Sequence, residues 1–206
     1  FAFLFSTVHI GIGKFGQWYT DSDLVAQYTS ALKLKNDLPE GSYRIDTYKT
    51  HDNLSMWLDK SCLQYFGSTA APSILSFYPA LGVKRDVRSE PDISNYALRG
   101  LLSVEYLITT PEKQTDFEYE ADAGWTFAGQ QDGYVLYRNQ NYVPMGFAYD
   151  YYLTQTEYEE TAKATRANLL MRALVLTDED AAVHGKYRTH LPEGRREELY
   201  YESYVQ

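Results

Sequence analysis

The segments that decide the fold class lie between Tyr43 and Thr110: YRIDTYKTHDN (residues 43–53), QYFGSTAAPSILSFYPALGVKRDV (64–87) and LRGLLSVEYLITT (98–110). The first segment alternates, with Tyr43, Ile45 and Thr47 on one face and Arg44, Asp46 and Tyr48 on the other. This period of two predicts a strand over 43–50, and the same pattern predicts another over 103–110. Between them, Pro72 suits the first turn of a helix over 73–81.

On both sides of this stretch, segments in which apolar residues repeat every two positions, as in strands, are mixed with segments in which they repeat about every 3.6 positions, as in helices. Strands are expected over 1–10, 125–138 (a hairpin turning at 129–133) and 145–153; helices are expected over 24–36, 94–102 (capped by Ser94) and 157–175. The first helix should bury Leu24, Val25, Tyr28, Ala31 and Leu32. Regular βαβ spacing is not seen. The sequence therefore predicts a single α+β domain, with a mixed or mostly antiparallel sheet covered by a few helices.

Composition limits the possible partners. The formal net charge of −9 repels phosphate backbones, so nucleic acid is not an expected partner. Cys62 is the only cysteine, which leaves no internal disulfide and no cysteine-based metal site. We interpret it as a small buried apolar residue. Residues 1–10 are apolar but only about half as long as a bilayer requires, so no transmembrane helix is expected.

Two short motifs have simpler interpretations than the chemistry they suggest. GIGKFG (11–16) matches a dinucleotide fingerprint, which requires a helix opening at its last glycine. No helical period begins before Leu24, so we favour a flexible turn over a nucleotide site. Asp21-Ser22-Asp23 has the D-x-D spacing with which some glycosyltransferases hold a metal and a sugar diphosphate. Helix capping by Asp23 explains these acids without a metal.

Residue chemistry indicates no catalytic residues, metal or cofactor. The four histidines, at positions 9, 51, 184 and 190, show no H-E-x-x-H spacing, and no serine lies in G-x-S-x-G. Neighbouring acids such as Glu159 and Glu160 point about 100° apart on a helix, as expected for solvated faces. The 20 tyrosines could stack on sugar rings, but half-buried sheet and interface positions are the commoner role.

Positive charge is concentrated at one place in the sequence. Arg44 lies on a predicted strand, Arg85 and Arg88 lie in one polar loop, and Arg99 follows shortly after. We hypothesise that Arg44, Arg85, Arg88 and Arg99 converge near Asn53 and bind phosphates or sugar hydroxyls, because the planar guanidinium binds oxygens bidentately. The alternative, which we favour, is that these arginines pair internally with Asp46, Asp52, Asp86 or Glu90.

The central stretch resembles the YfhO family of bacterial multi-pass membrane proteins. The matching phrases are YRIDTYKTHDNLSM, YFGSTAAPSILSFYPALGV, RDVRSEPDISNYALRGLLSVEYLI, GYVLYRNQNYVPMGFAYDYYL and LLMRALVLTDE. They follow the family order over most of residues 43–180. Glu105 departs from the pattern, because the family phrase carries lysine at that position.

The resemblance implies a large membrane enzyme of the GT-C glycosyltransferase type. Such enzymes take sugar from a polyprenyl-phosphate donor outside the cytoplasmic membrane and glycosylate envelope polymers such as lipoteichoic acid. Residues 1–206 would be the extracytoplasmic soluble domain of this larger protein, without the loop that carries the family's catalytic acid and without transferase activity of its own. Its expected partners are its own transmembrane helices and an envelope polymer or lipid-linked sugar. A stand-alone carbohydrate-binding module and a purely structural domain remain as alternatives.

Overall fold

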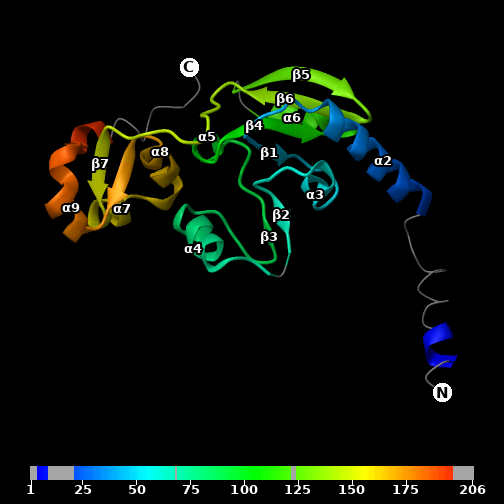
Figure 1. Ribbon diagram of the computed structural model, residues 1–206, viewed down its shortest axis with the longest axis horizontal. Helices are drawn as coiled ribbons and strands as arrows, with labels where there is room; N and C mark the ends of the chain where they lie inside the picture. Colours follow the sequence, from blue (N-terminus) through cyan, green and yellow to red (C-terminus); the bar gives the residue numbers. More distant parts are fainter. Residues whose placement is uncertain (1–3, 9–20, 68, 122–123, 197–206) are drawn as a thin grey trace.

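A mixed four-stranded sheet is the largest sheet in the computed structural model, which describes residues 4–8, 21–67, 69–121 and 124–196 (Figure 1). Its strands, in spatial order, are β1 (Arg44–Thr47), β4 (Val104–Thr109), β6 (Tyr134–Asn139) and β5 (Trp125–Gln131). β1 runs parallel to β4, while β6 is antiparallel to both β4 and β5. Together with the helices around it, this sheet confirms the predicted α+β class.

Both faces of the first two strands are covered. Ile45 and Asp46, which point to opposite faces of β1, are each fully buried, and so are Leu107 and Ile108 on β4. The alternation that predicted these strands therefore does not separate a core face from a solvent face. The predicted hairpin is confirmed, with its turn at Asp132 and Gly133, whose φ angles are 51° and 81°. Positive φ at both positions suits a two-residue hairpin turn.

The chain between β1 and β4 forms a long crossover that holds most of the remaining elements. These are α3 (Leu54–Leu58), β2 (Tyr65–Phe66), α4 (Pro72–Ala80), β3 (Arg88–Ser89) and α5 (Tyr96–Leu101). β2 and β3 pair as a short antiparallel ribbon. The helix predicted over 73–81 is confirmed by α4. The cap of α5 is Asn95, whose side chain accepts from the Leu98 amide, because the Ser94 amide and hydroxyl donate to Asp92 instead. After β4 the chain continues through η1 (Pro111–Lys113) and α6 (Gln114–Glu120).

A second, parallel sheet is built from the C-terminal part of the chain. Its elements are β7 (Tyr151–Thr154), α7 (Gln155–Glu160), η2 (Lys163–Thr165), α8 (Arg166–Leu170), β8 (Ala173–Leu176), α9 (Asp178–His184), η3 (Gly185–Tyr187) and β9 (Thr189–His190), with strand order β8-β7-β9. Ala167 of α8 packs in one cluster with Leu98 of α5 and Val104 of β4. The second sheet is therefore joined to the first through a shared core.

Two predictions in this C-terminal part were wrong. The strand expected over 145–153 is limited to β7, and the long helix expected over 157–175 is interrupted after Glu160. The Arg166 guanidinium holds the interruption in place by donating to the carbonyls of Glu159, Thr161 and Ala80. Ala173–Leu176 then pairs in parallel with β7, so the β propensity of this segment prevails over helical periodicity.

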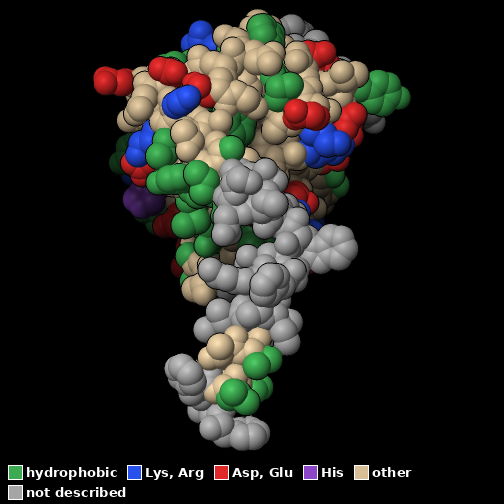
Figure 2. All heavy atoms as spheres, turned by 90° about the vertical axis from the view of Figure 1, so that its right-hand side faces the viewer, with side chains coloured by type: hydrophobic (Ala, Val, Ile, Leu, Met, Phe, Trp, Pro, Cys, Tyr) green, Lys and Arg blue, Asp and Glu red, His purple; other side chains and the backbone are tan. Residues whose placement is uncertain are grey.

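The N-terminal predictions were partly wrong. Residues 4–8 are helical and do not form part of a strand; in Figure 2 they stand away from the body and carry hydrophobic side chains. Helix α2 (Asp21–Asp37) confirms the helix predicted over 24–36. Of its expected buried face, Ala31 is confirmed, but Leu24, Val25, Tyr28 and Leu32 are exposed. Leu34 and Leu38 are buried in their place.

The position of α2 explains this difference. Only its C-terminal half packs on α3 and the sheet, and the other half extends beyond the body (Figure 1). The glycine motif at 11–16, the remaining residues of the segment predicted over 1–10, and the side chains of the D-x-D motif at 21–23 lie outside the described residues.

Candidate functional site

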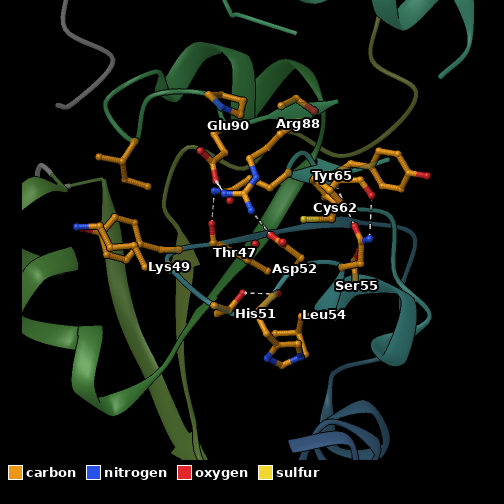
Figure 3. A pocket seen from close by; sticks show the side chains of 18 of the residues that line it. Thr47, Lys49, His51, Asp52, Leu54, Ser55, Cys62, Tyr65, Arg88 and Glu90 are labelled. Carbon is orange, nitrogen blue, oxygen red and sulfur yellow. Dashed lines mark hydrogen bonds and ion pairs between the residues drawn. The ribbon is translucent and has the colours of Figure 1, made fainter. Parts of the chain in front are cut away.

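A cavity of about 360 Å³ opens at the carboxyl end of β1 (Figure 3). Its walls are the segment that follows β1, the β2–β3 ribbon and the loop before α5. The charged and amide side chains that line it are Lys49, Asp52, Asn53, Gln64, Arg88, Glu90, Asp92, Arg99 and Glu120. The carboxyl end of a parallel strand is a common place for ligands in sheets flanked by helices. We therefore take this cavity as the candidate site.

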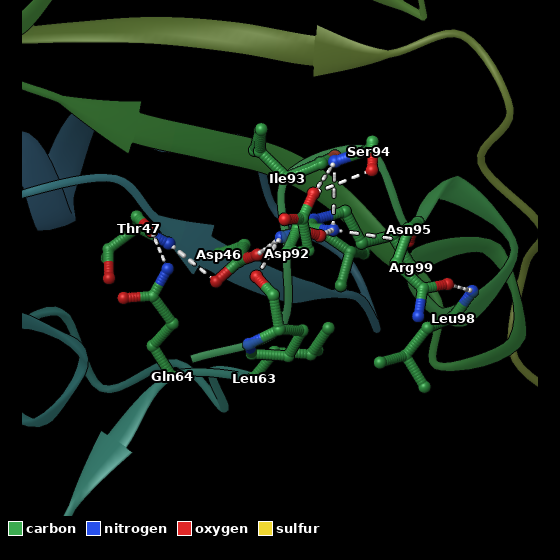
Figure 4. Close-up of polar contacts among 12 residues, drawn as sticks. Asp46, Thr47, Leu63, Gln64, Asp92, Ile93, Ser94, Asn95, Leu98 and Arg99 are labelled. Atoms are coloured by element: carbon green, nitrogen blue, oxygen red, sulfur yellow. Dashed lines mark hydrogen bonds and ion pairs between the residues drawn. The ribbon is translucent and has the colours of Figure 1, made fainter. Parts of the chain in front are cut away.

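A fully buried ion pair forms the floor of the cavity. Arg99 of α5 donates to the Asp46 carboxylate of β1 from Nε at 2.9 Å and from Nη2 at 2.8 Å. The remaining guanidinium donors bind the carbonyls of Pro91, Asp92, Ile93 and Asn95 (Figure 4). Burial raises the pKa of Asp46, against the opposing effects of the Arg99 charge and the Thr47 amide. This pair holds the loop before α5 against β1.

Arg88 and Asn53 line the same cavity, and both contact Phe66 of β2. The Arg88 guanidinium bonds Asp52 and lies 2.8 Å from Glu90, and these two carboxylates raise the pKa of Arg88. Asn53 has a left-handed backbone, with φ of 59°. Its side chain donates to the Phe66 carbonyl at 2.8 Å and accepts from the Phe66 amide at 3.0 Å. Asn53 thus fastens β2 to the segment that follows β1.

The other two predicted arginines lie outside this cavity. Arg44 donates to the Leu102 carbonyl at 2.8 Å. Arg85 donates to the carbonyls of Gly67 and Asp86 and lines a neighbouring cavity of about 540 Å³. The structure therefore brings Asn53, Arg88 and Arg99 to one cavity, and places Arg44 and Arg85 elsewhere.

Several lining residues were not predicted from the sequence. Lys49 bonds Glu120 of α6 at 2.9 Å, which closes one side of the cavity. The His51 ring stacks on Trp57 with centroids 4.4 Å apart, and burial lowers the pKa of this histidine. A run of polar residues directly after a buried strand could have signalled the cavity. Nothing in the sequence signals the distant contribution of Glu120.

Cys62 lies half-buried between the two cavities. Burial, followed by the charge of Asp46, raises the pKa of its thiol far above the ordinary value, so the thiol stays protonated at neutral pH. This agrees with its interpretation as a small apolar residue. Within the described ranges, no group of three or more His, Cys, Asp or Glu side chains is arranged to hold a metal ion.

The fold and the cavity define an α+β protein with a polar recess at the carboxyl end of β1. A search against family models matches residues 3–201 to the bacterial membrane protein YfhO, and the chain belongs to this family of bacterial membrane proteins. No curated protein and no solved structure gave a match. Of the helices that the structure describes, none has the length and apolar character to cross a bilayer.

Proposed function

We propose that this chain is an extracytoplasmic, non-catalytic domain of a membrane glycosyltransferase that modifies a cell-envelope polymer such as lipoteichoic acid. Membership of the YfhO family supports the membrane association. The GT-C type of the whole protein, which uses a lipid-linked sugar donor, rests on the family resemblance. In this proposal the membrane part carries out the transfer, and the domain faces the acceptor polymer.

The observation that carries the proposal is the cavity beside Asn53 and Arg88. Its volume of about 360 Å³ falls within the range of small-ligand sites and is sufficient for one unit of a polymer. Asn53 and the Asp46–Arg99 pair fix the segments around it, so the recess is held by the protein's own contacts. A preformed recess reduces the loss of conformational freedom on binding.

The test is retention of lipoteichoic acid by the purified chain, combined with glycosylation by the full-length protein in cells. We expect the polymer to be retained, and Arg88→Ala to reduce both retention and glycosylation. The matched control is Arg138→Ala, since Arg138 also pairs with a carboxylate, Glu105, but lies outside the cavity. Loss of retention with an unchanged melting temperature supports the proposal. Sugar transfer by the chain alone, or no retention of any polymer, would overturn it.

A structural domain that packs on the membrane part is the second candidate. The exposed apolar side chains on the N-terminal half of α2 favour it. If this candidate is correct, Val25→Ser should destabilise the full-length protein in detergent, and Arg88→Ala should leave polymer glycosylation unchanged.

A further inference from the structure

The Lys and Arg side chains around the cavity already form ion pairs with carboxylates. Arg88 lies between Asp52 and Glu90, Lys49 bonds Glu120, and Arg99 is saturated by Asp46 and backbone carbonyls. A phosphate could reach these cations only by displacing a carboxylate. The cavity is lined by more acidic than basic residues: the acids are Asp52, Glu90, Asp92 and Glu120, and the bases are Lys49, Arg88 and Arg99. This balance, in a protein of net charge −9, disfavours an anionic ligand.

Two of these carboxylates, Asp52 and Glu90, each use one oxygen to bind Arg88. Asp52 binds it through Oδ1, and Glu90 binds it through Oε1. Oδ2 of Asp52 and Oε2 of Glu90 take no part in these ion pairs, and the two side chains are 52% and 54% exposed. Figure 3 shows both carboxylates beside the Arg88 guanidinium. Two fixed acceptors suit hydroxyl donors, because an ionised carboxylate only accepts hydrogen bonds.

An apolar surface lies beside these acceptors. Phe66 of β2 lines the cavity and is 45% exposed. Its neighbour Tyr65 points to the opposite face of the strand, where its ring lies 5.9 Å from the Arg85 guanidinium beside the neighbouring cavity. Phe66 is held at its backbone by Asn53, and the Arg88 guanidinium lies 5.7 Å from the centre of its ring. Exposed aromatic rings provide packing area for the C–H face of a sugar ring, which carries no charge.

We infer that the cavity binds an uncharged sugar ring of the envelope polymer, and not its phosphates. Asp52 and Glu90 accept hydrogen bonds from the sugar hydroxyls, and Phe66 packs on the ring. This inference rests on the proposed function and narrows its ligand to one part of the polymer. It also assigns Arg88 a positioning role, because the guanidinium orients both carboxylates toward the ligand.

The test uses calorimetric titration of the chain with two probes. One is a panel of uncharged hexose and N-acetylhexosamine oligosaccharides, and the other is poly(glycerol phosphate) without sugars. We expect at least one sugar probe to bind with little dependence on salt, because no ion pair is formed with the ligand. We expect the sugar-free polymer not to bind.

Variants then place the ligand in the cavity. Asp52→Asn and Glu90→Gln should each weaken sugar binding about tenfold, since a charged acceptor is replaced by a neutral amide and the ion pair that orients it with Arg88 is lost. Phe66→Ala should weaken it about fivefold. The control Glu105→Gln removes a carboxylate that pairs with Arg138 away from the cavity, and should bind as the wild type does.

The outcomes separate the two proposals. Binding of sugar-free poly(glycerol phosphate) that weakens as salt rises overturns the inference and leaves the proposed function in place. Sugar binding that is unchanged in the Asp52, Glu90 and Phe66 variants also overturns it. Failure of both probes and of intact lipoteichoic acid overturns the proposed function itself.

Discussion

Asp46 and Arg99 lie 53 residues apart in the sequence and meet in an ion pair whose two side chains are 0% exposed. One belongs to the sheet and the other to the last helix of the crossover. Removing one partner of such a pair leaves a charge buried without compensation, which is far more unfavourable than the loss of a surface pair. The pair therefore fixes the cavity floor, and its disruption should be measurable as lost stability.

The first prediction concerns this pair. Arg99→Leu should lower the free energy of unfolding by about 3–5 kcal/mol, because the Asp46 carboxylate and four backbone carbonyls lose their donors. Urea denaturation followed by tryptophan fluorescence measures the change. As a control, Arg138→Leu removes an exposed partner of Glu105 and should change the free energy by less than about 1 kcal/mol. Similar small losses in both variants would show that the buried pair contributes little.

The second prediction concerns the two hydrogen bonds between the Asn53 side chain and the Phe66 backbone. Asn53→Gly keeps a residue that tolerates the φ of 59° but loses both side-chain hydrogen bonds. We expect a loss of about 1–3 kcal/mol and faster hydrogen exchange of the Phe66 amide. Asn53→Asp retains an acceptor for this amide, so it should preserve more of the protection. Unchanged hydrogen exchange of the Phe66 amide in Asn53→Gly would show that the Asn53 side chain does not protect this amide.

The third prediction concerns pH. Burial lowers the pKa of His51 below its ordinary value of 6.5, against the opposing charge of Asp52. The unfolded chain then binds the proton more readily than the folded protein. His51 therefore contributes its full stability above pH 6.5, and this contribution is lost as the pH falls below that value.

Replacing His51 by phenylalanine keeps an aromatic ring beside Trp57 and removes the titration. We expect the free energy of unfolding to decrease less between about pH 7.5 and pH 5 in His51→Phe than in the wild type. Parallel curves for the wild type and His51→Phe would refute the assignment to His51.

The fourth prediction concerns the cap of α7. Thr154 accepts from the Glu157 amide, and Glu157 accepts from the Thr154 amide in return. Thr154→Ala should lower the free energy of unfolding by about 0.5–2 kcal/mol. Thr165 precedes α8 but accepts no hydrogen bond from it, so Thr165→Ala should have a smaller effect in the same thermal melts. Equal effects would remove the capping explanation.

Local sequence patterns correctly predicted the helices and strands whose tertiary contacts are compatible with their own periodicity. β1, β4, α4 and the β5–β6 hairpin were all found from periodicity and turn residues. The long helix over 157–175 was wrong because the bonds that interrupt it reach the Ala80 carbonyl, 86 residues away from Arg166. The buried face of α2 was mostly wrong because only half of the helix has the rest of the protein to pack against.

The candidate site could be predicted only in part, for a similar reason. The sequence showed arginines and acids near one another, and Arg88 does lie between Asp52 and Glu90. Periodicity gives no distance between segments that are remote in the chain. It could not indicate that Arg99 lies beneath the cavity, that Arg85 faces a neighbouring one, or that Glu120 closes its side.

The parallel pairing of β1 with β4 also bears on how the protein folds. The two strands meet only after the whole segment 48–103 has closed as a loop, and that segment supplies most of the cavity wall. Loop closure of this length has an entropic penalty before any contact forms, and non-local strand pairing slows folding. The cavity is therefore complete only once this long-range pairing has formed, so ligand binding should not precede the recovery of the native sheet during refolding.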